Sequence, residues 1–210
     1  MLFFNFFPDK DFSNIKSFID EYLNLLKNSF DSLEIESIEN VLDQLDESIS
    51  QGKTILTCGN GGSSSISEHL VCDFIKQTAT LSSIEPRVHS LTNTASITAI
   101  ANDISFEEIF SYQVERYGNK DDILFCISSS GNSQNIINAI SVAKKIGMKT
   151  ISFVGFNGGK AKEISDFTIH INSENYGICE DSHQILMHIF SQYLRLKKLK
   201  NKKNLGKIKF

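Results

Sequence analysis

Apolar residues recur at helical spacing in the first quarter of the chain, before any strand-like segment. One set runs from Phe12 to Leu26 and a second from Ile35 to Ile49, with an apolar residue every three or four positions. This spacing gathers the apolar side chains on one face of a helix. The pattern predicts an N-terminal arm of two amphipathic helices, residues 11–51, which end at Gly52. Their apolar faces must pack on the rest of the chain or on copies of themselves.

After the arm, five short runs of apolar residues alternate with helical patterns. The strand-like runs are residues 54–58, 87–91, 123–128, 150–154 and 167–171; helical segments are expected at 63–76, 96–116, 134–147 and 158–164, and in a long last helix opening near Glu180. Such alternation predicts an α/β fold with a doubly wound, five-stranded parallel sheet flanked by helices. We expect a single domain with the arm, a core at 53–196 and a basic C-terminal segment at 197–210.

A glycine-rich turn follows the first predicted strand and leads into a helix that begins with three serines. Gly61 and Gly62 let the backbone approach a ligand, and the first helical amides have no internal partner, so this helix start attracts phosphate. His69 and Asp73 lie four positions apart and therefore on one helical face. An ordinary helix with a hydrogen-bonded histidine would show the same residues.

A second loop of this kind follows the third predicted strand. Residues 128–133 read Ser-Ser-Ser-Gly-Asn-Ser and a helix begins at once. One such loop could be a serine-rich turn with a good N-cap. Because ligands of parallel sheets bind beyond the carboxyl ends of the strands, two loops at strand ends predict that both bind one phosphorylated ligand.

The last predicted helix carries a polar stripe at four-residue steps: Glu180, Gln184 and His188. A surface helix would also be polar on one side. The chain has only five histidines, however, and His188 would lie opposite the helix that carries His69. We therefore favour a functional role for this stripe.

Composition indicates a soluble protein of the cytoplasm with no membrane or nucleic-acid partner. No apolar run reaches the roughly 20 residues that span a bilayer, and the Phe-rich opening lacks the basic residues and cleavage site of a signal peptide. The four cysteines show no CxxC spacing, so buried free thiols are expected. The first 194 residues hold 13 basic and 25 acidic residues. The basic C-terminal segment could touch a membrane or RNA, but a solvated terminus is the simpler interpretation.

Four motifs together resemble the sugar-isomerase (SIS) domain, and within it the bacterial phosphoheptose isomerases, over roughly Phe12 to Leu196. They are CGNGGS (58–63) with a histidine six residues later, AxxNDxxFEExFSxQVE (99–115), ISSSGNSxNIxxAI (127–140) and the helix ending in His188. The resemblance implies a homo-oligomer, usually a tetramer with the helical arms packed centrally. It also implies an enzyme that acts on sedoheptulose 7-phosphate, and histidines that in some members ligate zinc.

The resemblance also implies roles for individual residues. The serines would bind the phosphate, and Asn102 and Asp103 would meet sugar hydroxyls. His69 and His188 match the family's site histidines. The substrate-binding set is Asn60, Gly61, Gly62, Ser63, Asn102, Asp103, Ser128, Ser129, Ser130, Ser133 and Glu180.

Two residues depart from the family, which has glutamate at the position of Asp73 and glutamine at that of Glu180. If Asp73 were the base, its carboxylate would lie about 1.5 Å further from the substrate than the family's glutamate, because aspartate is one methylene shorter than glutamate. We hypothesise that His69, Asp73, Glu180 and His188 bind zinc or another divalent ion, that Glu180 is the base and that His188 is the acid. Alternatively, Asp73 keeps the family's role as base and Glu180 only binds a sugar hydroxyl or the metal.

The residues therefore predict an intramolecular oxidoreductase that interconverts a ketose and an aldose phosphate. Sedoheptulose 7-phosphate and glycero-manno-heptose 7-phosphate fit the resemblance, and the product would supply heptose to lipopolysaccharide or capsule. The segment NYGICE (175–180) replaces the family's usual approach to the last helix and leaves the identity of the sugar open. The alternative function is a non-catalytic SIS protein, either a sensor of sugar phosphates or a protein-binding factor of replication initiation. The retained histidines and carboxylates argue against it.

Overall fold

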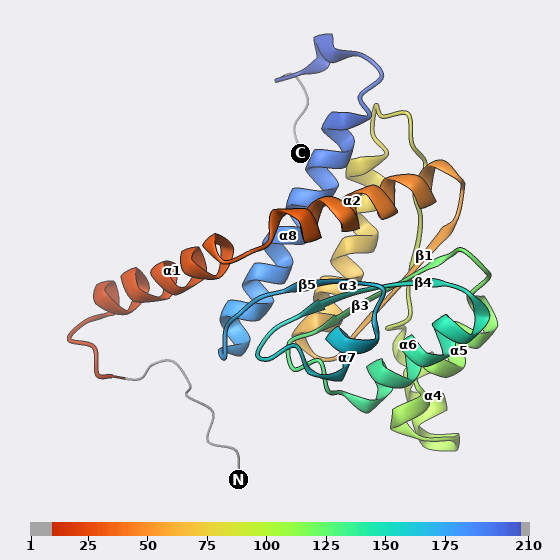
Figure 1. The fold of residues 1–210 in the computed structure, drawn as a ribbon, viewed down its shortest axis with the longest axis horizontal. Helices are drawn as coiled ribbons and strands as arrows, with labels where there is room; N and C mark the ends of the chain where they lie inside the picture. The colour runs from red at the N-terminus through yellow and green to blue at the C-terminus, as the bar shows by residue number, and fades with distance from the viewer. Residues whose placement is uncertain (1–9, 207–210) are drawn as a thin grey trace.

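A five-stranded, all-parallel sheet forms the centre of the molecule in a computed structural model that describes residues 10–206 (Figure 1). The Phe-rich opening and the last four residues of the basic segment lie outside the described residues. The sheet order is β2-β1-β3-β4-β5. The strands are β1 (Thr54–Gly59), β2 (Arg87–Ser90), β3 (Ile123–Ser128), β4 (Lys149–Val154) and β5 (Phe167–His170). The predicted fold class is confirmed.

Helices cover both faces of the sheet (Figure 1). One face packs against α2 (Ile35–Ser50), α3 (Gly62–Cys72) with its continuation η1 (Asp73–Thr78), and α8 (Tyr176–Lys197). The other packs against α4 (Thr94–Asp103), α5 (Ser111–Tyr117), α6 (Gln134–Ile146) and α7 (Gly159–Ile164). The remaining elements are α1 (Ile15–Asp31), η2 (Phe106–Glu108) and η3 (Lys202–Asn204).

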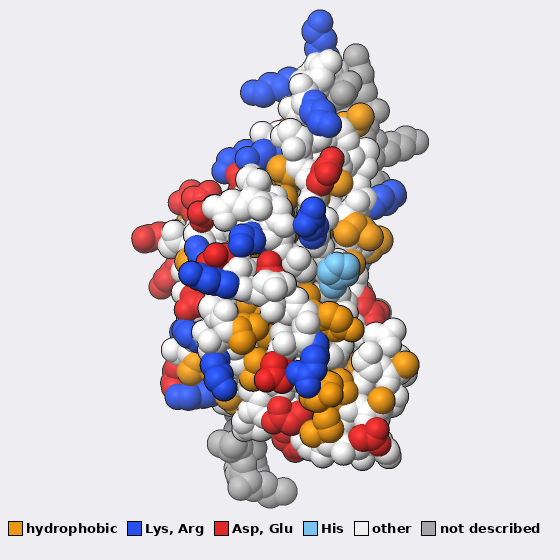
Figure 2. Space-filling model, turned by 90° about the vertical axis from the view of Figure 1, so that its right-hand side faces the viewer, with side chains coloured by type: hydrophobic (Ala, Val, Ile, Leu, Met, Phe, Trp, Pro, Cys, Tyr) orange, Lys and Arg blue, Asp and Glu red, His pale blue; other side chains and the backbone are white. Residues whose placement is uncertain are grey.

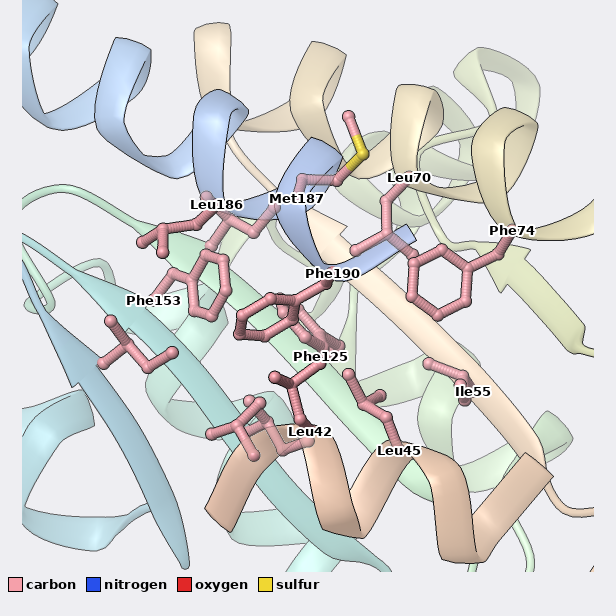
Figure 3. Close-up of a cluster of buried hydrophobic side chains, with 14 of the residues drawn as sticks. Leu42, Leu45, Ile55, Leu70, Phe74, Phe125, Phe153, Leu186, Met187 and Phe190 are labelled. Atoms are coloured by element: carbon pink, nitrogen blue, oxygen red, sulfur yellow. The ribbon is translucent and has the colours of Figure 1, made fainter. Parts of the chain in front are cut away.

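Alternating side chains of the strands supply the two cores. Phe125 on β3 and Phe153 on β4 point to the face of α2 and α8, where Phe190 packs on them (Figure 3). Their neighbours Leu124 and Val154 point to the opposite face. Because both faces are covered, the middle strands are apolar on both sides, as parallel sheets require.

Three element boundaries differ from the prediction. The segment 96–116 is split into α4, η2 and α5, because the chain leaves the helix at Ile104 and turns before re-entering. The last helix starts at Tyr176, where Asn175 caps it by accepting a hydrogen bond from the amide of Ile178 at 3.1 Å. The helix after the glycine loop starts at Gly62 and has no side-chain cap from its serines.

The two helices of the arm behave differently. Helix α2 buries Val41 and Leu45 against the sheet. Helix α1 extends away from the body (Figure 1) and leaves Ile15, Ile19 and Leu23 72%, 48% and 56% exposed. Helix α1 is held to α8 by the Tyr22 hydroxyl, which donates to Asp181 at 2.7 Å. These three apolar side chains therefore lie largely uncovered in the described chain, whereas Phe18, Leu25 and Leu26 of the same helix are half-buried.

The first residues of the basic C-terminal segment are paired rather than free. The amide of Ser83 donates to the carbonyl of Lys198 at 2.9 Å, and that of Lys200 donates to Leu81 at 3.1 Å. The ammonium of Lys198 lies 2.7 Å from Asp46 on α2. Basic side chains project at the top of the face in Figure 2, whereas charges of both signs are mixed over the rest of it.

None of the helices between residues 10 and 206 has the length and apolar character needed to cross a membrane.

The free energy of unfolding at acid pH depends on His183. This side chain of α8 is completely buried beside Phe153. Burial lowers the pKa of His183 from 6.5 to about 4. Between these values the unfolded chain binds a proton that the folded chain does not. The free energy of unfolding therefore rises from pH 4 to pH 6.5, by about 3 kcal/mol from this group. In urea titrations, His183→Leu should lose this pH dependence, and a matched change at the exposed His89, His89→Leu, should keep it. Parallel pH profiles for wild type and His183→Leu would contradict the assignment.

Candidate active site at the carboxyl edge of the sheet

The glycine loop and the serine loop meet where the strand order reverses. The chain leaves β1 towards β2 on one side, and β3 lies on the other side of β1, so ligands are expected beyond the carboxyl ends of these two strands. Asn60 after β1 and Asn135 on α6 join the loops through two reciprocal amide hydrogen bonds of 2.9 and 3.0 Å. A pocket of 110 Å³ lies between the loops, lined by Asn60, Ser63, Ile127, Ser128, Ser129, Ser130, Ser133, Tyr176 and Glu180.

The serine loop offers unused hydrogen-bond donors to this pocket. Ser133 is the N-cap of α6, yet its side chain makes no capping hydrogen bond. The hydroxyl of Ser129 is buried and has no hydrogen-bond partner among the described residues. Ser130 accepts from the amide of Asn132 at 3.3 Å, which leaves its own proton available. Free hydroxyls at a helix start form a site for a phosphate group.

The glycine loop admits the carboxylate of Glu180. A Cβ atom on Gly62 would lie 2.4 Å from a carboxylate oxygen of Glu180, so a larger residue at this position would displace the carboxylate from the loop. Gly61 has a φ of 56°, in the region that favours glycine. Burial raises the pKa of Glu180, and the charge of Asp181 raises it further. Glu180 is therefore a carboxyl group that lines the anion pocket and binds protons more readily than an exposed one.

A second cluster, His69, Asp73 and His188, lies between α3 and α8. The Nε2 atom of His69 is 3.5 Å from Oδ1 of Asp73, and that of His188 is 3.6 Å from Oδ2. The imidazole rings meet edge to face with centroids 4.9 Å apart. Asp73 is 1% exposed and opens the π-helical turn η1, a feature frequent at functional sites. The structure thus brings together three of the four predicted metal ligands.

The donor set of this cluster fits a divalent metal ion. One ligand atom from each of the three residues lies within 4.8 Å of the others. Ligands held tetrahedrally by zinc at about 2.0–2.1 Å lie ~3.3–3.5 Å apart, so the three side chains would have to draw together by roughly an ångström to bind the ion. Gln77 donates to Oδ1 of Asp73 at 2.7 Å and orients the carboxylate. Two imidazoles and one carboxylate also leave a coordination position open, as catalytic zinc sites do. Glu180 lies at the glycine loop and is not part of this three-residue group.

Two residues of the site had no predicted role. Tyr176 lines the pocket between the loops, and Asn135 bonds to Asn60 beside it. Gln184, predicted only as part of the polar stripe, bridges the two histidines of the cluster. Asn102 and Asp103, predicted to bind sugar hydroxyls, lie exposed at the end of α4, bonded to each other at 2.7 Å, and do not line the pocket. Their role stays a prediction.

The fold and the paired loops define a class of protein, the sugar-isomerase domain. The family model described as SIS domain matches residues 17–155. A phosphoheptose isomerase of Clostridium acetobutylicum is 37% identical over 177 residues, which are 84% of this chain and 89% of that protein. One from Helicobacter pylori (strain P12) is 38% identical over 164 residues, 78% of this chain and 85% of that protein. The solved phosphoheptose isomerase of Neisseria gonorrhoeae superposes with a TM-score of 0.78 at 26% identity, covering 86% of this chain and 96% of that one. The chain belongs to the phosphoheptose isomerase family of SIS-domain proteins.

Proposed function

We propose that this isomerase converts sedoheptulose 7-phosphate to D-glycero-D-manno-heptose 7-phosphate in the cytoplasm, for heptose of lipopolysaccharide or capsule. The observation that carries the proposal is the convergence of two anion-binding loops on one pocket that also holds the Glu180 carboxylate. A phosphate needs the hydroxyls and helix starts of these loops, and an aldose-ketose isomerisation needs a carboxylate near the sugar's other end.

The chemistry moves one proton between neighbouring carbons. A base takes a proton from C1 of the ketose while an acid protonates the carbonyl oxygen on C2, which gives an enediol. The base then returns a proton to C2, and the proton of the C1 hydroxyl leaves as the aldehyde forms. We assign the base to Glu180 and the acid to His188. The raised pKa of Glu180 suits a base, because it holds the transferred proton more tightly than an ordinary carboxylate.

Burial argues against Asp73 as the base. Its carboxylate is 1% exposed and is engaged by Gln77, and both neighbouring imidazoles face it. A sugar carbon could reach it only if those partners moved. If Asp73 nevertheless keeps the family's role, Glu180 would bind a sugar hydroxyl or the metal.

Zinc or another divalent ion would be held by His69, Asp73 and His188. Glu180 would become a fourth ligand only after its side chain leaves the glycine loop. Such an ion, when bound, polarises the sugar carbonyl as a Lewis acid. Metal analysis of the purified protein should find about one divalent ion per active site. His69→Ala should lose it because it removes one of the imidazole ligands. Leu substitution of the exposed His89 is the control, and equal metal content in both variants would contradict this centre.

The exposed face of α1 supports assembly as a homo-oligomer, for which we propose a tetramer. Ile19 and Leu23 lie one turn apart on this face, and their burial between subunits would stabilise the assembly. Light scattering should show that Ile19→Glu with Leu23→Glu yields smaller species. The matched pair Asn24→Glu with Asn28→Glu adds the same charges to exposed positions of the same helix and should leave the mass unchanged. A monomeric wild type would refute the proposal.

The substrate assignment is tested by incubating the purified protein with sedoheptulose 7-phosphate and with a panel of pentose and hexose phosphates. We expect the heptose phosphate to be converted with the highest kcat/KM. Preferred conversion of a pentose or hexose phosphate would support isomerase activity and contradict the heptose phosphate as the substrate. Absence of any conversion would favour a non-catalytic SIS protein.

A further inference from the structure

Gln184 occupies a position between the two imidazoles of the His69, Asp73 and His188 cluster. It lies on α8 one turn before His188, and its side chain is partly buried. The amide nitrogen is 3.1 Å from Nδ1 of His69 and 3.3 Å from Nε2 of His188. One side-chain amide thus contacts both imidazoles that would hold a metal ion.

The hydrogen-bond partners of His69 decide which of its ring nitrogens carries a proton. Its Nδ1 faces Gln184 and its Nε2 faces Asp73. A neutral imidazole has one N–H donor and one bare nitrogen, and the group bonded to one nitrogen selects the state of the other. When the Gln184 amide donates to Nδ1, the proton sits on Nε2 and points at Asp73. That form of His69 offers no Nε2 lone pair to a metal ion beside Asp73.

The opposite orientation of the same amide prepares the site for metal. A half-turn about the last side-chain torsion exchanges the oxygen and nitrogen of Gln184. The oxygen then accepts a hydrogen bond from Nδ1–H of His69, and the bare Nε2 faces Asp73. Metal-bound histidines commonly donate their second N–H to such an acceptor, which fixes the ring and strengthens the ligand.

We propose that Gln184 is a positioning residue of this cluster, whose amide sets the tautomer of His69 and turns over when a divalent ion binds. The inference rests on the metal centre within the proposed function and adds to it a residue outside the ligand set. In the metal-free protein the amide donates to both rings. In the metal-bound protein its oxygen accepts from His69 alone, and Nε2 of His188 is released towards the ion.

Two variants separate the roles of the amide. Gln184→Leu removes both donor and acceptor, so His69 loses its tautomer control and zinc affinity should fall by about 10–100-fold, the usual effect of losing such a partner. Gln184→Glu can only accept, so it should hold Nδ1–H of His69 before metal arrives and bind zinc at least as tightly as wild type. Gln192→Leu makes the same change at an exposed position of α8 and should have no effect.

The experiment combines histidine-¹⁵N NMR of the metal-free protein near pH 8, where free imidazole is neutral, with zinc titration against a chromophoric chelator. We expect wild-type His69 to carry its proton on Nε2, the Glu variant to carry it on Nδ1, and the Leu variant to show a mixture. Unchanged spectra and zinc affinity in Gln184→Leu, or a Glu variant as weak as the Leu variant, would overturn the proposal.

These readouts are independent of the substrate. If wild type converts none of the sugars, the proposed reaction fails while the ring spectra and zinc affinities keep their meaning. If wild type binds no zinc, the metal centre and the turning of the amide on binding are both wrong. The spectra of the metal-free protein then decide whether Gln184 sets the tautomer.

Discussion

Glu180→Gln should lower kcat by about 10²–10⁴-fold, the range expected when a general base is removed. Glutamine has nearly the shape of glutamate but cannot take a proton from carbon, so binding of the sugar phosphate should change little. The acid limb of the pH-rate profile should also disappear. In wild type that limb reports a carboxyl whose pKa burial has raised, and activity is lost as the pH falls through it. Steady-state kinetics from pH 5 to pH 8 measures both effects.

Asp73→Asn is the matched comparison, because it makes the same change in the other carboxylate of the site. We expect it to weaken metal binding and to lower kcat, with recovery at high metal concentration. Asp73 would act through the ion, whereas Glu180 would act on the sugar. If Glu180→Gln stays nearly fully active while Asp73→Asn is inactive and unrescued by metal, the base is Asp73 and our assignment is wrong.

Ser130→Ala combined with Ser133→Ala should weaken binding of phosphorylated sugars by about 10²-fold or more. Each hydroxyl would donate to a charged phosphate oxygen, and hydrogen bonds to charged groups contribute about 1.5–3 kcal/mol each. The hydroxyls line the pocket, and Ser133 makes no hydrogen bond that caps its own helix. Their loss should therefore reduce affinity far more than the free energy of unfolding. Calorimetric titration with a phosphosugar, and urea unfolding of the same variants, give the two quantities.

Ser141→Ala on the same helix provides the control, since that hydroxyl bonds only to the carbonyl of Ile137 within α6. Its affinity for phosphosugars should equal that of wild type. If the double variant also binds phosphosugars with wild-type affinity, the serine loop is not part of the phosphate site.

The fold was predictable because its strands and helices are locally consistent. Runs such as residues 123–128 are apolar on both sides, and this is the pattern of a strand buried in a parallel sheet. Helix boundaries were harder to predict where a local cap or turn sets them. Asn175 starts the last helix one turn earlier than the polar stripe suggested, and Ile104 breaks the segment after α4. These are cap and turn effects, which hydrophobic periodicity does not register.

The site was predictable only as far as residues share a loop or a helical face. His69 and Asp73 follow from four-residue spacing, and both anion-binding loops follow from their glycines and serines. The placement of Glu180 against Gly62 does not, because it depends on how α8 packs against the glycine loop. The contact of Gln184 with His69 spans 115 residues and is likewise a product of tertiary packing. Asn102 and Asp103 lie outside the pocket of the single chain, and their predicted contact with the sugar awaits a test.

We propose that this pocket isomerises sedoheptulose 7-phosphate through an enediol. The most direct test follows the reaction by NMR in D₂O. We expect wild type to form the aldose heptose 7-phosphate and part of the product to carry deuterium at C2, because the base exchanges its proton with solvent before returning it. Glu180→Gln should form product orders of magnitude more slowly. No aldose product from wild type at any metal loading would contradict the claimed activity, and product formed by Glu180→Gln as fast as by wild type would contradict the assigned base.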